Sequence, residues 1–270
     1  MRRVPLIFGL VAVGFVVVAA LLALVWTPYD PAVIDPVHRL GGPGWPHVLG
    51  TDTFGRDIAS RLMAGSRTCL LVGIVAVAIA SAFGIPLGML AGMTHGVVSR
   101  VVLRATDLLY AFPAILVAML LAAAFGGSSL TGTLAIGIAT VPVFTRVARA
   151  GTLSVMSQDY IWAARGSGIS WASIAVRHVW PNIAPLIGVQ ASVSFGMAIL
   201  AEASLSYLGL ATPPTTPTWG RMLYDAQAQL FNAPLLTLWP AAAIVVAVMG
   251  FNVLGDALRD LLDPRLREVS

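Results

Sequence analysis

The sequence predicts an all-α membrane protein with six transmembrane helices and both termini in the cytoplasm. The first observation is its composition: 58% of the 270 residues are hydrophobic, 10% are charged, and the mean hydropathy is +0.87. A soluble domain carries about 25% charged residues, so this composition is typical of a membrane protein. The second observation is a series of six long apolar runs, and the third is the distribution of arginine between them.

Each apolar run approaches the length that a membrane-spanning helix needs, which is roughly 20 residues for a bilayer core of about 30 Å. The first run follows Arg2 and Arg3, as in a signal peptide, but its apolar core exceeds the typical length of about 7 to 15 residues, so we expect a retained helix. The fourth run is short unless its helix continues past Arg146, whose side chain would then reach the interface. The expected spans are 6–26, 70–91, 108–125, 130–144, 185–208 and 235–254.

The orientation follows from arginine, because the chain contains no lysine and has a formal net charge of +4. Basic residues of membrane proteins concentrate in the cytoplasmic segments. A cytoplasmic N-terminus obeys this rule, since it leaves only Arg39, Arg56, Arg61, Arg67 and Arg221 outside. The arginines then expected inside are Arg2, Arg3, Arg100, Arg104, Arg146, Arg149, Arg165, Arg177, Arg259, Arg265 and Arg267.

Two outer segments, 27–67 and 209–234, are long and rich in proline and glycine. The second contains "TPPTTPTWG" (212–220), in which the prolines oppose helix and keep the chain extended or turned. A simple connector needs about 2 to 8 residues. We therefore expect these segments to form a contact surface rather than mere connections.

Residues for catalysis are not evident. A P-loop and a Schiff base both need a lysine, which is absent, and no G-x-S-x-G elbow occurs. The four histidines are scattered without metal-ligand spacing, so no metal site and no cofactor are expected. Cys69 is the single cysteine, and its apolar neighbours indicate a packing role.

Ionisable residues are nearly missing from the expected spans, which weakens the case for a proton-coupled transporter. Glu202, followed by Ser204 and Ser206, lies near the outer end of the fifth span. These residues either anchor the outer end of the bundle or contact the transported solute, and we favour anchoring. Asp107 lies three residues after Arg104, so we expect an ion pair on one helix face.

The inner segment 146–184 is far longer than a connector and predicts a helix, a sharp bend and a second helix. A short helix should end at Gly166 and Gly168, and Pro181 should forbid simple continuation of the next one. Small residues at Ala163, Ala164 and Gly168 would let another backbone approach, so the bend can fit a groove of a cytoplasmic partner. The apolar stripe of the second helix is Trp171, Ile174, Ala175, His178 and Val179, and its polar stripe is Ser170, Ser173 and Arg177.

This bend resembles the EAA loop of membrane subunits in bacterial ATP-binding-cassette importers. The family pattern reads E-A-A-x-x-x-G, nine residues, I-x-L-P, and Ala163, Ala164, Gly168 and Pro181 match it. The glutamate is replaced by Trp162, as is common in the peptide and nickel branch, and the Ile and Leu positions hold His178 and Trp180. The resemblance implies that the segment couples the subunit to an ATPase. The coupling residues implied are Trp162, Ala163, Ala164, Arg165, Gly168, Trp171, Arg177 and Pro181.

Three further stretches resemble signatures of that branch, in particular of its second, shorter permease. "LGTDTFGRDIASRLMAGSRTCLLVG" (49–73) is similar to its L-G-T-D-x-x-G-R-D signature. The other two are "EASLSYLGL" (202–210) with "PTWG" (217–220), and "NVLGDALRDLLDPRL" (252–266). Within the first stretch, Asp52, Arg56 and Asp57 form either a hydrogen-bonded turn, which we favour, or a docking patch for a solute-binding protein.

The resemblance implies the type I importer permease fold and a multi-pass subunit of the bacterial cytoplasmic membrane. It implies a paralogous permease as heterodimer partner, two cytoplasmic ATPase subunits or domains and an extracytoplasmic solute-binding protein, with no nucleic acid. Residues 1–68 would be the first helix and an outer loop, and 69–270 a five-helix transmembrane domain with the coupling loop 146–184. ATP hydrolysis would belong to the partners, so the chain itself would not be an enzyme.

The function implied is import of dipeptides or oligopeptides. Transport of nickel or another small solute by the same kind of machine is the nearest alternative. A stand-alone secondary transporter or channel would follow a proton gradient without an ATPase. A membrane-embedded enzyme would turn over as the purified chain alone.

Overall fold

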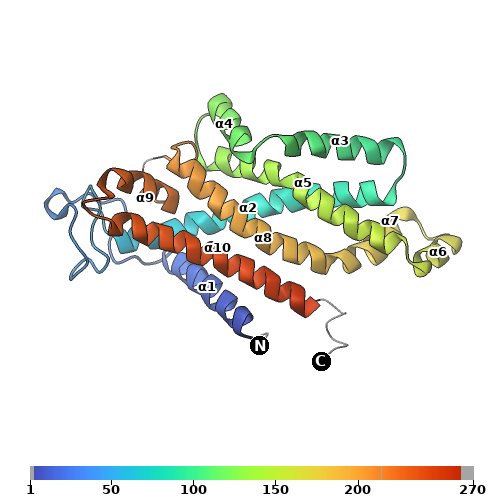
Figure 1. The fold of residues 1–270 in the computed structure, drawn as a ribbon, viewed down its shortest axis with the longest axis horizontal. Helices are drawn as coiled ribbons and strands as arrows, with labels where there is room; N and C mark the ends of the chain where they lie inside the picture. The colour runs from blue at the N-terminus through green and yellow to red at the C-terminus, as the bar shows by residue number, and fades with distance from the viewer. Residues whose placement is uncertain (1–2, 214, 263–270) are drawn as a thin grey trace.

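The computed structural model describes residues 3–213 and 215–262, and within these ranges it is helical with no β-strand (Figure 1). The predictions for Arg2, Arg265 and Arg267 lie outside the described residues. Short 3₁₀ segments are η1 (Pro36–His38) and η3 (Gln227–Gln229), and η2 (Ala175–Val179) is a π-helical turn. The α-helices are α1 (Arg3–Leu22), α2 (Ile58–Met93), α3 (Val97–Ala111), α4 (Ala114–Phe125), α5 (Ser129–Met156), α6 (Asp159–Gly166), α7 (Trp171–Ile174), α8 (Trp180–Tyr207), α9 (Trp219–Ala226) and α10 (Leu235–Leu262).

The long helices α2, α5, α8 and α10 run along the molecule and pack side by side, with α1 against α10 (Figure 1). Segments 23–57, 209–213 and 215–234, the last of which includes α9, gather at one end, hereafter the loop end. Helices α6 and α7 form the opposite end, hereafter the bend end. Gly9 of α1 lies against the backbone of Leu254 in α10, so the start of α1 and the end of α10 share one side of the bundle.

Five helices are long and apolar enough to cross a membrane: α1, α2, α5, the run from α7 through α8, and α10. The sixth apolar segment is the pair α3 and α4, which is bent by 82°. The expected span 108–125 is therefore not one continuous helix, although the bent pair can still count as a sixth span. Pro113 is the cause, because it lacks an N–H and disfavours helical backbone at Phe112, whose ψ is 125°.

The fourth expected span is longer than its apolar core, because α5 continues past Arg146 to Met156. The guanidinium of Arg146 lies 2.8 Å from the carboxylate of Asp107 and 4.0 Å from the ring centre of Tyr110. The predicted pairing of Asp107 with Arg104 is thus wrong. Helix α3 lies along α5, so a partner on the neighbouring helix replaces the one on the same helix.

Helices α2 and α5 approach closely along a row of glycines spaced four residues apart. A Cβ atom added at Gly84 would lie 2.6 Å from Phe144, and one at Gly88 would lie 2.6 Å from Ala148. The third member, Gly92, faces Thr152 in the same way, at 2.7 Å. Small residues at every fourth position let two membrane helices pack backbone against backbone. This contact fixes the two helices that connect the loop end to the bend end.

The helix does not end at Pro181, because α7 continues into α8, but it continues through the π-helical turn η2 rather than as a regular α-helix. The N–H of Trp180 donates to the carbonyl of Ala175, five residues earlier, which is the π-helical pattern. A proline ring clashes with the carbonyl four residues before it, and the wider π turn relieves this clash. The side chain of Asn182 donates to the carbonyl of His178 at 2.6 Å, so that carbonyl keeps a partner.

Candidate functional site

The bend end is built from α6, a tight turn and α7. The N–H of Ser167 donates to the carbonyl of Ala163 at 3.0 Å, and the N–H of Ile169 donates to that of Ala164 at 3.2 Å. Between them Gly168 has a φ of +79°, a left-handed conformation that closes a helix and favours glycine. Ser170 then caps α7 by accepting from the N–H of Ser173. The predicted helix, bend and helix are all present.

Arg165 joins the two helices of the bend through aromatic stacking. Its guanidinium carbon lies 5.1 Å from the ring centre of Trp162 on α6 and 4.5 Å from that of Trp171 on α7. A cation over an aromatic face is attracted to the ring quadrupole. Because the two indoles are 61% and 47% exposed, the stack presents two large rings and one positive charge at the surface.

The predicted coupling residues divide into an exposed set and one buried member. Ala164 is only 8% exposed and belongs to the chain's own packing, which includes Ile161, Ile174 and Val179. Of the expected apolar stripe, Ile174 and Val179 are buried, whereas Trp171 is exposed. The exposed coupling residues are Trp162, Ala163, Arg165, Gly168, Trp171, Arg177 and Pro181.

A groove of about 1150 Å³ separates this bend from the adjacent ends of α2 and α5. Met89 and Met93 of α2 and Met156 of α5 line one side, and the Trp162 and Trp171 rings line the other. Methionine side chains adapt to different partners. The bend end therefore combines a protruding turn with an adaptable apolar groove.

At the loop end, Asp52 organises the turn that precedes α2. Its carboxylate accepts from the N–H groups of Phe54 and Arg56, at 2.8 and 3.0 Å. Gly55 has a φ of +79°, and a Cβ there would collide with the backbone of Asp35. Asp57 caps α2 by accepting from the N–H of Ser60 at 2.8 Å. The hydrogen-bonded turn that the sequence favoured is therefore present, and the Asp52, Arg56 and Asp57 side chains point inward.

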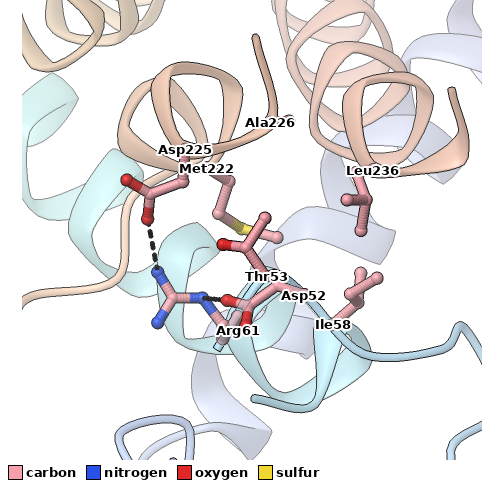
Figure 2. Close-up of a pocket in the computed structure, with 8 residues that line it drawn as sticks. All are labelled: Asp52, Thr53, Ile58, Arg61, Met222, Asp225, Ala226 and Leu236. Atoms are coloured by element: carbon pink, nitrogen blue, oxygen red, sulfur yellow. Dashed lines mark ion pairs between the residues drawn. The ribbon is translucent and has the colours of Figure 1, made fainter. Parts of the chain in front are cut away.

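Asp52 and Arg56 join a cluster of ion pairs that connects this turn and the start of α2 to α9. Arg56 contacts Asp52 at 2.7 Å and Asp225 at 2.9 Å. Arg61 lies between the same two carboxylates, at 3.6 and 3.9 Å, beside a cavity of about 20 Å³ (Figure 2). Arg221 contacts Asp225 at 3.1 Å. Three arginines and two aspartates thus connect segments more than 150 residues apart in sequence.

The "PTWG" motif (217–220) packs between the 49–73 stretch, in α2, and the 202–210 stretch, in α8. Trp219 is 3% exposed, and a Cβ at Gly65 would lie 2.7 Å from its ring. The indole N–H donates to the carbonyl of Leu62 at 3.0 Å. Gly220 lies against the backbone of Ala203 in α8, where a Cβ would come within 2.7 Å of the Ala203 Cα. The motif therefore holds α2 and α8 together at the loop end.

Glu202 is buried beside this motif, with 3% of its surface exposed. Ser206 Oγ donates to its carboxyl group at 2.6 Å, and Ser206 also lies 2.6 Å from the Thr212 hydroxyl. Ser204 bonds only to its own helix, through the carbonyl of Leu200. A buried acid needs such partners. The group connects α8 to the loop that leads to α9.

The outermost loop contains two histidine and aspartate pairs. His38 Nδ1 lies 2.7 Å from Asp35, and His47 Nδ1 lies 3.0 Å from Asp57. The hydrogen bond to His38, followed by that from the Val37 N–H, lowers the pKa of Asp35. Within 3–213 and 215–262, no group of three or more His, Cys, Asp or Glu side chains lies together as metal ligands would.

Sequence reasoning missed Asp225, Arg61 and Arg221 as members of the ionic cluster. A signal was available, because Arg221 and Asp225 are four residues apart on a helix that follows the capping residue Thr218. Sequence spacing does not reveal that Asp225 pairs with Arg56 and Arg61, which lie far away in the sequence. Sequence spacing does not reveal the contact between Trp219 and Gly65 either.

Comparison with known proteins supports the resemblance noted in the sequence. The family described as "Binding-protein-dependent transport system inner membrane component" matches residues 84–268. A dipeptide transport system permease protein DppC of Alkalihalophilus pseudofirmus is 39% identical over 262 residues, which cover 97% of this chain and 86% of that protein. A glutathione transport system permease protein GsiD of Pectobacterium atrosepticum is also 39% identical over 262 residues, covering 95% and 87%.

The fold is similar to that of a solved importer. An inward-facing structure of the MetNI methionine ABC transporter matches with a TM-score of 0.64 at 16% identity, covering 75% of this chain and 97% of that chain. A second crystal form of the same transporter matches with a TM-score of 0.63. At this level of identity the likeness concerns the fold alone.

Proposed function

Because the chain belongs to the binding-protein-dependent transport system inner membrane components, in the dipeptide and oligopeptide branch of ATP-binding-cassette importer permeases, we propose that it moves short peptides across the cytoplasmic membrane. A permease of this family works with ATPases and a solute-binding protein. ATP hydrolysis by those partners would drive transport, with this chain converting closure of the ATPases into alternating access.

The observation that carries the proposal is the exposed bend of α6 and α7. Ala163 is exposed and small, and Gly168 forms a turn with nothing within 4 Å of its Cβ position. Beside them the stacked Trp162, Arg165 and Trp171 offer aromatic rings and a positive charge. Aromatic residues and arginine are the side chains that most often dominate protein interfaces. We propose this surface as the ATPase contact.

We also propose where the remaining partners bind. We propose a paralogous permease as the heterodimer partner, with 69–270 as the shared transmembrane domain. The loop end would receive the binding protein, since Trp45 and Phe231 there are 94% and 95% exposed. That docking surface would be supported from the protein interior by the buried side chains of Asp52, Arg56 and Asp57.

Both termini would be cytoplasmic, because this orientation keeps most arginines inside. Single cysteines placed in a Cys69→Ser background test it with a membrane-impermeant thiol reagent. We expect Val37→Cys and Thr215→Cys, both at exposed positions of the loop end, to react from the outside and Gly166→Cys only after the inner face is opened. The reverse pattern would overturn the orientation.

A large side chain introduced at an exposed position of the bend tests the proposed ATPase contact. Ala164 is unsuitable because it packs inside the chain, so the variant is Ala163→Trp, with Val37→Trp at the loop end as the control of equal bulk. We expect the complex isolated through Ala163→Trp to lose most of its ATPase while keeping the permease pair, and the control to keep both. Retention of the ATPase and of ATP-driven uptake by Ala163→Trp would refute the assignment.

Peptides are favoured over nickel as the solute by the relatives, whose names specify dipeptide and glutathione transport. Among the described residues no cluster of metal ligands lies along the bundle. Uptake assays with a mixture of short peptides and with radioactive nickel would separate the two solutes. Nickel uptake without peptide uptake would overturn the peptide assignment.

A further inference from the structure

An open cavity of about 700 Å³, hereafter the outer chamber, lies at the loop end between the N-terminal half of α2, the first turns of α5 and the residues Thr216 and Pro217. Its volume falls in the range of about 300 to 1000 Å³ that is usual for small-molecule sites. Apolar side chains line much of it. Its polar side chains are Thr27, Arg67, Thr68, Ser129, Thr133 and Thr216.

Arg67 is the only charged side chain that lines the chamber among the described residues. The other arginines of the loop end have partners: Arg39 donates to the carbonyl of Thr53, and Arg56, Arg61 and Arg221 belong to the ionic cluster. No carboxylate or carbonyl partner of Arg67 is present in the described part of the chain. Its five N–H donors are therefore available inside an open cavity.

A second feature favours negative charge in the same place. The 28-residue helix α5 begins at the chamber wall, where Ser129, Leu130 and Thr133 line the cavity. The first turn of a helix carries a partial positive charge, which favours anions. In α5 the Ser128 hydroxyl already accepts from the Thr131 N–H, so it is the charge of the helix start that bears on the chamber. Ser129 and Thr216 add hydroxyl groups that make no hydrogen bond to other described residues. The guanidinium, the helix start and the hydroxyls thus line one cavity, and each is a kind of group that binds carboxylates.

We propose that the outer chamber receives the C-terminal carboxylate of the peptide when it leaves the binding protein, with Arg67 as the residue that selects it. The inference rests on the proposed peptide transport and deepens it. A peptide of the kind proposed carries one terminal carboxylate whatever its side chains, so a single arginine serves many sequences. The guanidinium fork matches a carboxylate in a bidentate way, which lysine does not reproduce.

The test compares peptides with and without that carboxylate in the assembled transporter. Purified complexes of this chain with its permease partner, ATPases and binding protein are placed in liposomes. The probes are a defined mixture of tripeptides with free C-termini and the same mixture with amidated C-termini, and ATP-driven uptake of each is measured by mass spectrometry. The binding protein is the same in every complex, so a change in preference between variants belongs to the permease.

We expect Arg67→Gln to reduce the preference for free over amidated peptides by about fivefold or more, with uptake of the amidated mixture changed little. Arg67→Lys should give an intermediate preference, and Arg39→Gln should keep that of the wild type. If Arg67→Gln keeps the wild-type preference for free over amidated peptides, the assignment is overturned and Arg67 would instead bind lipid phosphates. If Arg67→Gln does not assemble, a wild-type preference in Arg67→Lys has the same meaning. A wild-type complex that takes up neither mixture would instead overturn the proposed function.

Discussion

At the scale of single residues, the two glycines of the bend end provide a matched pair. Gly168 has a φ of +79°, whereas Gly166 lies at the end of α6 with ordinary backbone angles, and no neighbour lies within 4 Å of either Cβ position. Gly168→Ala should cost about 1 to 2 kcal/mol through backbone strain alone. Gly166→Ala should cost nothing.

We therefore expect Gly168→Ala to weaken ATPase recovery and ATP-driven uptake several-fold, while Gly166→Ala behaves as the wild type. Co-purification followed by uptake in vesicles measures both. Equal behaviour of the two variants would show that the left-handed turn is not needed for coupling.

Glu202 gives a second prediction at this scale. Its carboxyl group accepts a hydrogen bond from Ser206, and an amide oxygen can accept the same bond. Glu202→Gln should leave uptake within about twofold of the wild type. Glu202→Leu leaves the buried Ser206 and Thr212 hydroxyls without this acceptor and should destabilise the chain by about 1 to 3 kcal/mol.

The measurements are thermal unfolding of the detergent-solubilised complex and uptake in vesicles. Ser204→Ala is the control, because that hydroxyl bonds only to its own helix. Loss of transport by a fully assembled Glu202→Gln complex would contradict the anchoring role and place the acid in the pathway.

At the scale of elements, the glycine row between α2 and α5 makes the sharpest prediction. Leucine at Gly88 would have to enter the space of Ala148, whereas a Cβ atom added at Gly188 of α8 would meet nothing within 4 Å. Overpacking of a tight core costs about 1 to 3 kcal/mol or more. Gly88→Leu should therefore lower the yield of assembled complex strongly, and Gly188→Leu should not. Normal assembly of Gly88→Leu would show that the helices can separate here without loss.

Hydropathy alone located five of the six apolar elements, because a bilayer demands about 20 apolar residues whatever the tertiary contacts. The errors fall where tertiary contacts or local geometry decide the outcome. Pro113 breaks the third apolar segment, and the π turn at 175–179 carries the helix past Pro181. Asp107 forms an ion pair with Arg146 of α5 rather than with Arg104 on its own helix.

The same limit applies to the candidate site. Motif spacing predicted the bend of α6 and α7 and the turn at Asp52, since both depend on glycine positions and hydrogen bonds that are close in sequence. The ionic cluster depends on Asp225, which lies 169 residues from Arg56, and no spacing rule reaches that far. Burial of Ala164 likewise became visible only when α6 was packed against the bundle.

At the scale of the whole molecule, the loop end and the bend end are joined by two long helices. Helix α2 has 36 residues and α5 has 28, and the glycine row binds them together near the bend end. Packed helices rather than flexible loops therefore connect α6 and α7 to the loop end. The ionic cluster and Trp219 hold the opposite end of α2 to α9. This arrangement suits a subunit that converts an inner movement into an outer one.

The most direct test of the central claim is peptide uptake by the complex purified through this chain and placed in liposomes. ATP supplied on the ATPase side should drive accumulation of short peptides, and a non-hydrolysable ATP analogue or removal of the ATPase should abolish it. A proton gradient without ATP should have no effect. Peptide accumulation by this chain in the absence of an ATPase, driven by such a gradient, would contradict the account.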